Sequence, residues 1–289
     1  MEINELKAFV AVVESGSFSS AAERIHLTQP AISKRIAQLE SRINKPLFDR
    51  IGHQVQLTEA GNTLLPHAHK ILNALQDSLN DIEQLDVIPR GILRIGTSYH
   101  VGLHYLPSIL KPYYSDYPEI ELDIHFMDSE NALAAVEKGH IELAIITLPP
   151  QLPAHLQAKS FWSDPMLIYC ALNHPLATST DINDLTHYAA ILPDTHTITR
   201  QLVEKEMIRQ GLSLNVRLSS NHLESIRMMV EIGLGWSVLP ITLKSPDLHS
   251  CTFPNLHFFR ELGIVINNQR TLTQAANLLI KRIESNQHE

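Results

Sequence analysis

Apolar residues between positions 29 and 43 follow the repeat of an amphipathic helix. Ile32, Ile36, Leu39 and Ile43 have a 4-3-4 spacing, which places their side chains on one narrow stripe at about 3.6 residues per turn. The opposite face carries small or hydrogen-bonding side chains and one cation, namely Gln29, Pro30, Ser33, Lys34, Ala37, Gln38 and Ser41. A merely solvated face more often carries Glu and Lys. The pattern therefore predicts a helix that packs on one side and can approach base edges closely with the other.

Two shorter helices are expected before this one. The first ends at Gly16 and has an apolar face, formed by Ile3, Leu6, Phe9, Val10 and Val13. Ser20 and Glu23 have the spacing of a capping box, which predicts that the second helix opens there and runs to about Leu27. Thr28 is the expected N-cap of the third helix. Two helices joined by a tight turn, the second with an exposed polar face, predict a helix-turn-helix.

The segment after the third helix predicts a wing and then a long helix. Two short strands are expected around Gly52 and His53 in PLFDRIGHQVQLTEAG. From Thr58 to about Asp86, apolar residues repeat at 3-4-3-4-3 along a helix of roughly 40 Å; they are Leu65, Ala68, Leu72, Leu75, Leu79 and Ile82. A heptad seam of this length needs a partner, so we interpret it as a dimerisation helix, followed by a hinge at residues 89–91.

Residues 91–289 alternate between strand and helix patterns, which predicts parallel sheets covered by helices. The repeating units are too numerous for one small sheet, so two lobes with a cleft between them are expected. The predicted fold class is mixed: an all-α winged helix-turn-helix, a long linker helix, and a two-lobed α/β domain. The predicted boundaries are 1–58 for the DNA-binding domain, 59–88 for the linker, 91–163 with 266–289 for lobe I, and 164–265 for lobe II.

The net charge of −8 is compatible with a DNA partner because the charge is unevenly distributed. Between Arg24 and Arg50, six basic side chains outnumber the two acidic ones, Glu40 and Asp49, which gives a local charge of +4. Attraction to phosphate depends on the field within a Debye length of about 8–10 Å. An acidic body elsewhere in the chain therefore does not prevent DNA binding.

The sequence gives no indication of a targeting signal, a membrane-spanning segment or a cysteine-based site. The sequence has no apolar run of the roughly 20 residues needed to cross a bilayer, and its first residues lack the basic leader of a signal peptide. A cytoplasmic protein is therefore expected. Cys170 and Cys251 are the two cysteines and show no paired spacing, so neither a disulfide framework nor a Cys-rich zinc site is predicted.

The string SFSSAAERIHLTQPAISKRIAQLESRINKPLFDR resembles the N-terminal signature of the LysR-type transcriptional regulators. It shares the paired alanines, Thr-Gln-Pro-Ala, a Ser, the Leu-Glu pair and Leu-Phe-x-Arg, and the order of predicted domains extends the similarity over the whole chain. It departs from the family at Asn44, where a Gly is usual, but Asn tolerates left-handed backbone angles. The resemblance implies a periplasmic-binding-protein-like effector domain, a homodimer or homotetramer, and a dyad-symmetric DNA site. A regulator of this kind can also contact RNA polymerase.

The resemblance also implies which residues contact DNA. By position, Gln29, Pro30, Ser33 and Lys34 reach the major groove, and Arg50 holds a phosphate near the wing. The physical pattern of the third helix selects the same face. Arg35 lies nearer the edge of the buried stripe, so a phosphate contact and a surface ion pair are equally good interpretations of it.

An effector site is expected where the strands of the two lobes end. In open α/β sheets ligands bind beyond the carboxyl ends of strands, often at helix starts. The candidates in such positions are Thr97, Ser98, Tyr99, His100, Ser129, Thr147, Thr195, Thr197 and Asn221. Hydroxyls at helix starts suit an anion such as a carboxylate or an inorganic oxyanion, although each Ser or Thr would also serve as a simple helix cap. The sequence therefore predicts a small, anionic effector.

Other classes of protein fit the residues less well. An enzyme would need a nucleophile–base pair or a cofactor loop, and the sequence contains no Walker A motif, no G-x-S-x-G and no dinucleotide fingerprint. No catalytic residue and no cofactor is predicted. His100 and His104 could hold a metal, but no third ligand has a suitable spacing, so no metal site is predicted. Two alternatives stay open: a DNA-binding regulator that senses oxidation through Cys170 and Cys251, and a solute-binding protein, which would share the two-lobed fold.

Overall fold

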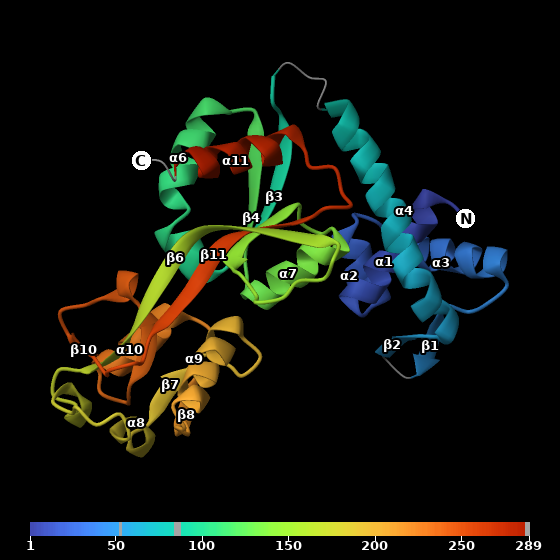
Figure 1. Ribbon diagram of the computed structural model, residues 1–289. Coiled ribbons are helices and arrows are strands. Elements are labelled where there is room, and N and C mark those ends of the chain that lie inside the picture. The colour runs from blue at the N-terminus through green and yellow to red at the C-terminus, as the bar shows by residue number, and fades with distance from the viewer. Residues whose placement is uncertain (52–53, 84–87, 287–289) are drawn as a thin grey trace. The chain divides into compact units, whose positions relative to one another are not determined.

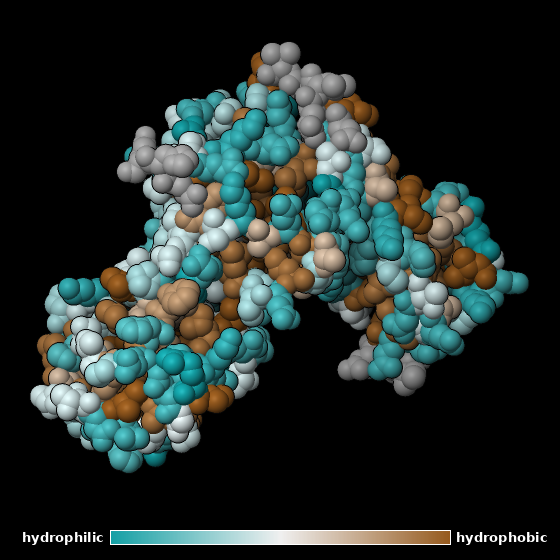
Figure 2. All heavy atoms as spheres, in the orientation of Figure 1, coloured by the Kyte–Doolittle hydropathy of each residue, from teal (hydrophilic) through white to brown (hydrophobic). Residues whose placement is uncertain are grey.

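The computed structural model of the chain describes residues 1–51, 54–83 and 88–286 (Figure 1). The chain divides into two compact units, Met1–Glu83 and Gln84–Glu289, and each has an apolar core of its own. Within the described residues no helix is long and apolar enough to cross a bilayer. Hydrophilic and hydrophobic side chains are interspersed over the visible face (Figure 2).

The N-terminal unit consists of short helices around a small core, followed by a hairpin and a long helix. Its elements are α1 (Ile3–Ser15), α2 (Phe18–Arg24), α3 (Gln29–Ile43), β1 (Phe48–Ile51), β2 (Gln54–Leu57) and α4 (Glu59–Glu83). Phe9 of α1 is buried in this core together with Ile32 and Ile36 of α3. The strands expected for the wing are β1 and β2, which pair antiparallel, while the turn at Gly52 and His53 lies outside the described residues.

The bounds of α2 differ from the prediction. Ser17 rather than Ser20 is the N-cap: the Ser17 backbone is extended, and its Oγ accepts a hydrogen bond from the Ser20 amide at 3.1 Å. The helix ends at Arg24 and not near Leu27, because His26 adopts a positive φ of 54°, which a right-handed helix does not allow. The predicted capping box is therefore wrong, and the residues that suggested it lie inside the helix.

The heptad seam of α4 divides into a buried half and an exposed half. Ala68 is buried in the core of the N-terminal unit, and Leu65 and Leu72 pack against that core. The seam residues that follow are exposed: Leu75 by 37%, Leu79 by 47% and Ile82 by 64%. The prediction that the whole seam needs a second chain is therefore wrong for its first half, which packs on its own chain. The second half presents an apolar face.

The C-terminal unit is a two-lobed α/β domain, as predicted. Its strands are β3 (Gly91–Thr97), β4 (Ile120–Phe126), β5 (Leu143–Thr147), β6 (Leu156–Ala171), β7 (Ala190–Leu192), β8 (Val216–Ser219), β9 (Ser237–Pro240), β10 (Leu248–Cys251) and β11 (Phe258–Asn267). Its helices are α5 (Tyr99–His104), α6 (Pro107–Asp116), α7 (Ser129–Lys138), α8 (Asp184–His187), α9 (Ile198–Arg209), α10 (Leu223–Glu231) and α11 (Gln274–Ser285), with 3-10 turns at Pro175–Ala177 and Ile241–Leu243.

One sheet runs through both lobes in the order β10-β6-β11-β5-β3-β4, and β9 also pairs with β6. β3 is parallel to β4 and β5, whereas the long strands β6 and β11 are antiparallel and connect the lobes (Figure 1). In lobe II, β7 pairs in parallel with β8. Parallel strands end at the same edge of a sheet, so the loops that follow β3, β4 and β5 lie together in lobe I.

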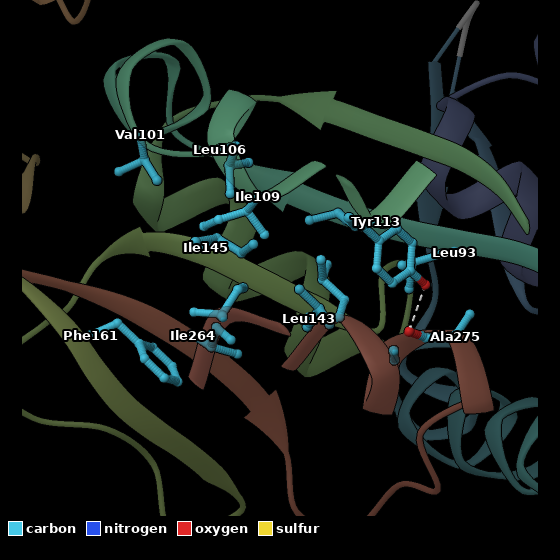
Figure 3. Close-up of a cluster of buried hydrophobic side chains, with 14 of the residues drawn as sticks. Leu93, Val101, Leu106, Ile109, Tyr113, Leu143, Ile145, Phe161, Ile264 and Ala275 are labelled. Atoms are coloured by element: carbon cyan, nitrogen blue, oxygen red, sulfur yellow. Dashed lines mark hydrogen bonds between the residues drawn. The ribbon is translucent and has the colours of Figure 1, made fainter. Parts of the chain in front are cut away.

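Lobe I is stabilised by apolar packing on both faces of β5. Successive side chains of a strand point to opposite faces. Leu143 and Ile145 therefore contribute to the core beneath α6 and α11, while Ala144 packs with α7. Figure 3 shows the first of these cores, at the edge of which the Tyr113 hydroxyl donates a hydrogen bond to the Ala275 carbonyl at 2.8 Å.

The second boundary between the lobes lies earlier than the predicted residue 265. Residues 262–266 of β11 pair with β5, and Leu262 and Ile264 belong to the core of lobe I, whereas Phe258 belongs to the core of lobe II. The crossing on β11 therefore falls near Arg260. An apolar strand shared by two cores gives no sequence signal for the point at which it passes from one to the other.

Candidate functional site

The exposed face of α3 is the candidate DNA interface. The predicted stripe is confirmed: Ile32, Ile36 and Leu39 are buried in the N-terminal core. On the other side Gln29, Pro30 and Lys34 are exposed and Ser33 is partly exposed. The Nε2 of Gln29 donates a hydrogen bond to the Ser33 Oγ at 3.3 Å. This contact holds the two polar side chains together at the start of the helix, on its outer side.

Some of the basic residues near this face lie in a groove beside it and not on the face itself. Arg35 lines a groove between the helices together with Lys7 and Arg24, and Arg24 is paired with Glu14 at 2.7 Å. Arg35 therefore extends along the flank of α3 rather than its outermost face. Arg50 belongs to β1, but its side chain lies outside the described residues.

A cavity lies between the two lobes of the C-terminal unit, beyond the ends of the strands. It encloses about 50 Å³. Residues from lobe I, lobe II and the crossing strand β11 all contribute to its wall: Ser98, Tyr99, His100, Asp128, Ser129, Glu130, Thr147, Pro193, Thr197, Ile198, Thr199, Asn221, Leu223 and Arg260. The segments that follow β3, β4, β5, β7 and β8 converge here, as expected for ligand sites in α/β folds.

Seven of the nine predicted effector residues are among these lining residues, and two are not. The hydroxyl of Thr97 is fully buried and donates to the Ile145 carbonyl at 2.9 Å, so it serves the pairing of β3 with β5. Thr195 is exposed in the turn before α9. Neither residue lies at the cavity as the structure describes it, so Thr97 and Thr195 are corrected as candidates.

The structure separates the hydroxyls that cap helices from those that do not. The Oγ1 of Thr197 accepts a hydrogen bond from the Arg200 amide at 3.2 Å and caps α9. The Oγ of Ser129 accepts from the Thr147 amide at 3.3 Å. Ser98 precedes α5, but its hydroxyl makes no capping bond with the described backbone. Ser98 is therefore a predicted hydroxyl that lines the cavity and is not used as a helix cap.

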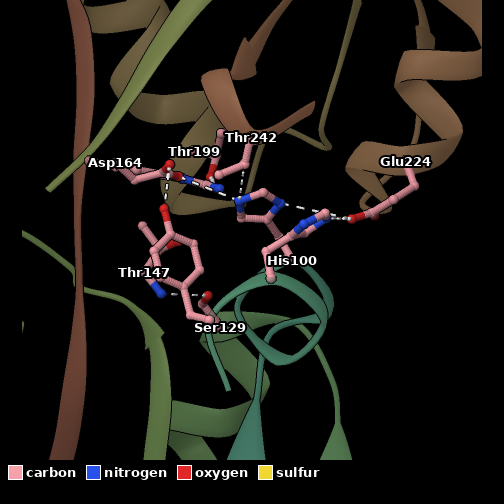
Figure 4. A network of polar contacts seen from close by, with 10 residues as sticks. His100, Ser129, Thr147, Asp164, Thr199, Glu224 and Thr242 are labelled. Carbon is pink, nitrogen blue, oxygen red and sulfur yellow. Dashed lines mark hydrogen bonds and ion pairs between the residues drawn. The ribbon is translucent and has the colours of Figure 1, made fainter. Parts of the chain in front are cut away.

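Arg260 in the cavity wall belongs to a buried ion pair that was not predicted from the sequence. Figure 4 shows the polar network around its partner Asp164. The Nε of Arg260 donates to the Asp164 Oδ2 at 2.7 Å, and its Nη1 donates to the Thr199 Oγ1 at 3.0 Å. The Arg260 side chain is 4% exposed and that of Asp164 is 1% exposed. The Tyr105 hydroxyl donates to the Asp164 Oδ1 at 2.9 Å, and burial raises the Tyr105 pKa. The phenol therefore remains a donor.

One nitrogen of this arginine is left over. The Nη2 of Arg260 is buried and has no hydrogen-bond partner within residues 88–286. Arg260 interrupts the apolar run FFRELGIVI, and Asp164 precedes the apolar run PMLIYCA. A charged residue inside a strand with such neighbours is rarely buried unless it is paired, so these two charges were the available signal for the site.

Polar contacts across the cavity join lobe I to lobe II. The Nδ2 of Asn221 donates to the Asp128 Oδ2 at 2.8 Å, and its Oδ1 accepts from the Asp194 amide at 3.0 Å. The Ile198 amide, in the first turn of α9, donates to the Glu130 Oε1 at 2.6 Å. A carboxylate of lobe I thus occupies the N-terminal end of a helix in lobe II, a position where negative charge is stabilised.

The two cysteines lie close together inside lobe II. Cys170 on β6 and Cys251 on β10 are both buried, with their sulfur atoms 3.4 Å apart. Neither lines the interlobe cavity. The contact between the two thiols raises the Cys251 pKa and lowers the Cys170 pKa. Both side chains belong to the core of lobe II.

The same organisation occurs in known proteins. Residues 3–62 match the family model of bacterial regulatory helix-turn-helix proteins of the lysR family, and residues 88–287 match that of the LysR substrate binding domain. Probable RuBisCO transcriptional regulators of Cyanophora paradoxa and of Synechocystis are 29% and 28% identical to this chain. The matched region spans 97% of this chain in both cases, and 90% and 85% of the respective relative. A full-length OxyR variant from Pseudomonas aeruginosa shares the fold, with a TM-score of 0.74, 24% identity, and coverage of 98% of this chain and 95% of that one.

Proposed function

The chain belongs to the LysR family of bacterial transcriptional regulators, and we propose that a small anion in its interlobe cavity modulates its binding to promoter DNA. The helix-turn-helix binds DNA, with α3 as the recognition helix. Gln29, Pro30, Ser33 and Lys34 contact the major groove, and their exposure opposite the buried stripe supports this assignment. Arg35 on the flank of α3 contacts a phosphate, and Arg50 holds another by its position in the family signature.

The active form is a homo-oligomer, a dimer or a tetramer. The apolar second half of α4 supports this assignment, because Leu79 and Ile82 remain exposed while the first half of the same seam packs on its own chain. Exposed leucine and isoleucine at heptad spacing are stabilised when a second helix covers them. Two copies of α3 would then read a dyad-symmetric site.

The observation that carries the anion proposal is the unpartnered Nη2 of Arg260. A buried donor without an acceptor costs about 1–3 kcal/mol, and more when the group is charged. Arg260 lines the cavity, and the bonds of its guanidinium to Asp164 and Thr199 fix the orientation of the group. Its Nη2 is buried, so a small movement of the side chain would bring this nitrogen to a ligand in the cavity. An anion in the cavity would accept the remaining hydrogen bond, and charge-assisted bonds of this kind are the strong ones.

Two carboxylates in the lining would oppose an anion, and both are already engaged. Asp128 accepts from Asn221, and Glu130 accepts from the Ile198 amide. The hydrogen bond from the Ile198 amide to Glu130 also supports the proposal, because it places a carboxylate at the N-terminal end of α9. An effector carboxylate can take that position if the Glu130 side chain turns away, which would also remove one of the two opposing charges.

The size of the cavity limits the class of effector. About 50 Å³ is enclosed, and one water needs about 10–15 Å³ on the same scale. The space therefore accommodates a group of a few non-hydrogen atoms, such as the carboxylate of a small organic acid or an inorganic oxyanion. Larger ligands would require the lobes to move apart.

The position of the site between the lobes explains how the anion would modulate DNA binding. An anion held by Arg260, Ser98 and the start of α9 contacts elements of both lobes, so its binding favours one interlobe arrangement. A coupling free energy of about 1–3 kcal/mol between anion and DNA would change DNA affinity by about 5- to 150-fold.

The proposal is tested by a thermal-unfolding screen of the full chain against small carboxylates and inorganic oxyanions, each compared with sodium chloride at equal ionic strength. A ligand present at a hundred times its Kd stabilises the folded state by about 2.7 kcal/mol. For a domain of about 200 residues this corresponds to a rise in Tm of roughly 5–10 °C. If no small anion raises Tm above the chloride control, the anion proposal is wrong.

A further inference from the structure

His100 and His104 of lobe I lie together with Glu224 of lobe II. His100 also lines the interlobe cavity, and Figure 4 shows His100 and Glu224 facing each other. His100 and His104 are one turn apart on α5, and their ring centroids are 4.7 Å apart. Glu224 is in the first turn of α10. Its Oε1 lies 3.2 Å from the His104 Nε2 and 3.8 Å from the His100 Nδ1. One ligand atom from each residue lies within 4.8 Å of the other two.

His100 carries the observation that an ordinary ion pair does not explain. Its side chain is 3% exposed, and its Nδ1 is buried without a hydrogen-bond partner in the part of the chain that the structure describes. The distance of 3.8 Å to the Glu224 oxygen is too long for a hydrogen bond. The Nδ1 nevertheless faces the space that His104 and Glu224 share. A pair formed by His104 and Glu224 alone would leave this nitrogen unsatisfied.

The other nitrogen of His100 has the surroundings that a metal ligand usually has. Its Nε2 is 3.2 Å from the Thr242 Oγ1 and 3.7 Å from the Asp164 Oδ2. The Thr242 hydroxyl can accept a hydrogen bond from Nε2, and the negative charge of Asp164 favours a proton on the same nitrogen, so the surroundings favour the tautomer with its lone pair on Nδ1. Ligating histidines commonly donate their second nitrogen to a hydroxyl or a carboxylate, which fixes the ring and its tautomer.

We propose that His100, His104 and Glu224 bind a divalent transition-metal ion of the zinc class. Two imidazole nitrogens and one carboxylate oxygen match the ligands of such ions, whereas Ca²⁺ and Mg²⁺ prefer oxygen alone. Three protein ligands leave a coordination position for water or for a ligand in the neighbouring cavity. The side chains of His104 and Glu224 are each 30% exposed, so an ion can reach the site from solvent.

The proposal adds a second ligand to the protein. His100 also lines the anion cavity, whereas His104 and Glu224 do not. The ion would nevertheless join α5 of lobe I to α10 of lobe II, so its binding would favour the arrangement of lobes in which the three residues meet. A regulator with this site would respond to metal availability as well as to its anion.

The test is metal binding by the untagged full chain after removal of metal with a chelator. Calorimetric titration with Zn²⁺ and visible spectroscopy with Co²⁺ report affinity and coordination separately. We expect one tight site per chain and the intense visible bands of four-coordinate Co²⁺. His104→Gln and Glu224→Gln should each weaken that site by about a hundredfold or more and abolish the bands. Thr242→Val should weaken it by about tenfold, as for other partners of a ligating histidine.

The control variant is His155→Gln. His155 forms a similar exposed pair with Glu137 at 3.0 Å, and its side chain is 32% exposed, but it belongs to no described group of three ligands. The chain has 16 histidines, so weak surface binding is expected in every variant, and the tight site should persist in this one. Equal Zn²⁺ affinity in wild type, His104→Gln and Glu224→Gln, or the absence of a tight site in the wild type, would overturn the proposal.

Discussion

Arg260→Lys should weaken the binding of the anion by roughly 10- to 100-fold while the chain stays folded. A hydrogen bond to a charged group contributes about 1.5–3 kcal/mol, which corresponds to this range. Lysine keeps a positive charge beside Asp164 and so avoids leaving a buried carboxylate alone, which would cost about 3–5 kcal/mol. It lacks the planar fork with which arginine reaches Asp164, Thr199 and the cavity at once. Calorimetric titration with the anion found in the screen measures the loss.

Two further variants make this prediction specific. Ser98→Ala removes a cavity hydroxyl that caps no helix. It should lower the affinity for the anion by a smaller factor, on the order of tenfold. Arg217→Lys, on the exposed strand β8, is the matched control and should have no effect. Wild-type anion affinity in both Arg260→Lys and Ser98→Ala would show that the effector binds elsewhere.

Lys34→Ala should raise the Kd for DNA by about tenfold or more while leaving anion affinity unchanged. Each lost contact of a basic side chain with DNA costs about 1–3 kcal/mol, and a dimer loses two of them. Because Lys34 is exposed and alanine favours helix, the fold should not suffer. If the contact is to phosphate, the loss should be similar for all sequences, and the dependence of log Kd on log salt should fall by about one unit per contact.

Lys70→Ala is the control for this experiment, because Lys70 is an exposed lysine of the same unit on α4. Fluorescence anisotropy with a DNA duplex selected by the protein from a random library measures both variants. The assignment of α3 would be wrong if Lys34→Ala bound that duplex as tightly as the wild type and the Lys70→Ala control.

The helices of the N-terminal unit were largely predictable because their signals are local. The stripe of Ile32, Ile36 and Leu39 specifies which side of α3 is buried, and no distant contact alters it. The errors are local as well. Ser17 and Ser20 both had the chemistry of a cap, and the left-handed Gly16 and extended Ser17 decided between them. The positive φ of His26 set the other end of the helix. The prediction of one partner for the whole α4 seam was wrong for its first half, because periodicity shows that a face is apolar but not which partner covers it.

The cavity was predictable in place but not in its most important residues. Hydroxyls at the ends of strands follow from topology, and most of the predicted ones do line the cavity. Asp164 and Arg260 are 96 positions apart, and they meet because β6 and β11 are antiparallel. The third candidate metal ligand, Glu224, is 120 positions from His104, which is why the sequence alone predicted no metal site.

Linkage between the anion and DNA tests the central claim most directly. The wild-type Kd for the selected duplex should be measured by anisotropy with and without a saturating concentration of the anion that stabilises the chain, at constant ionic strength. We predict that the two values differ by about 5- to 150-fold, and that Arg260→Lys needs far more anion to show the change. Identical Kd values with and without bound anion would contradict the account.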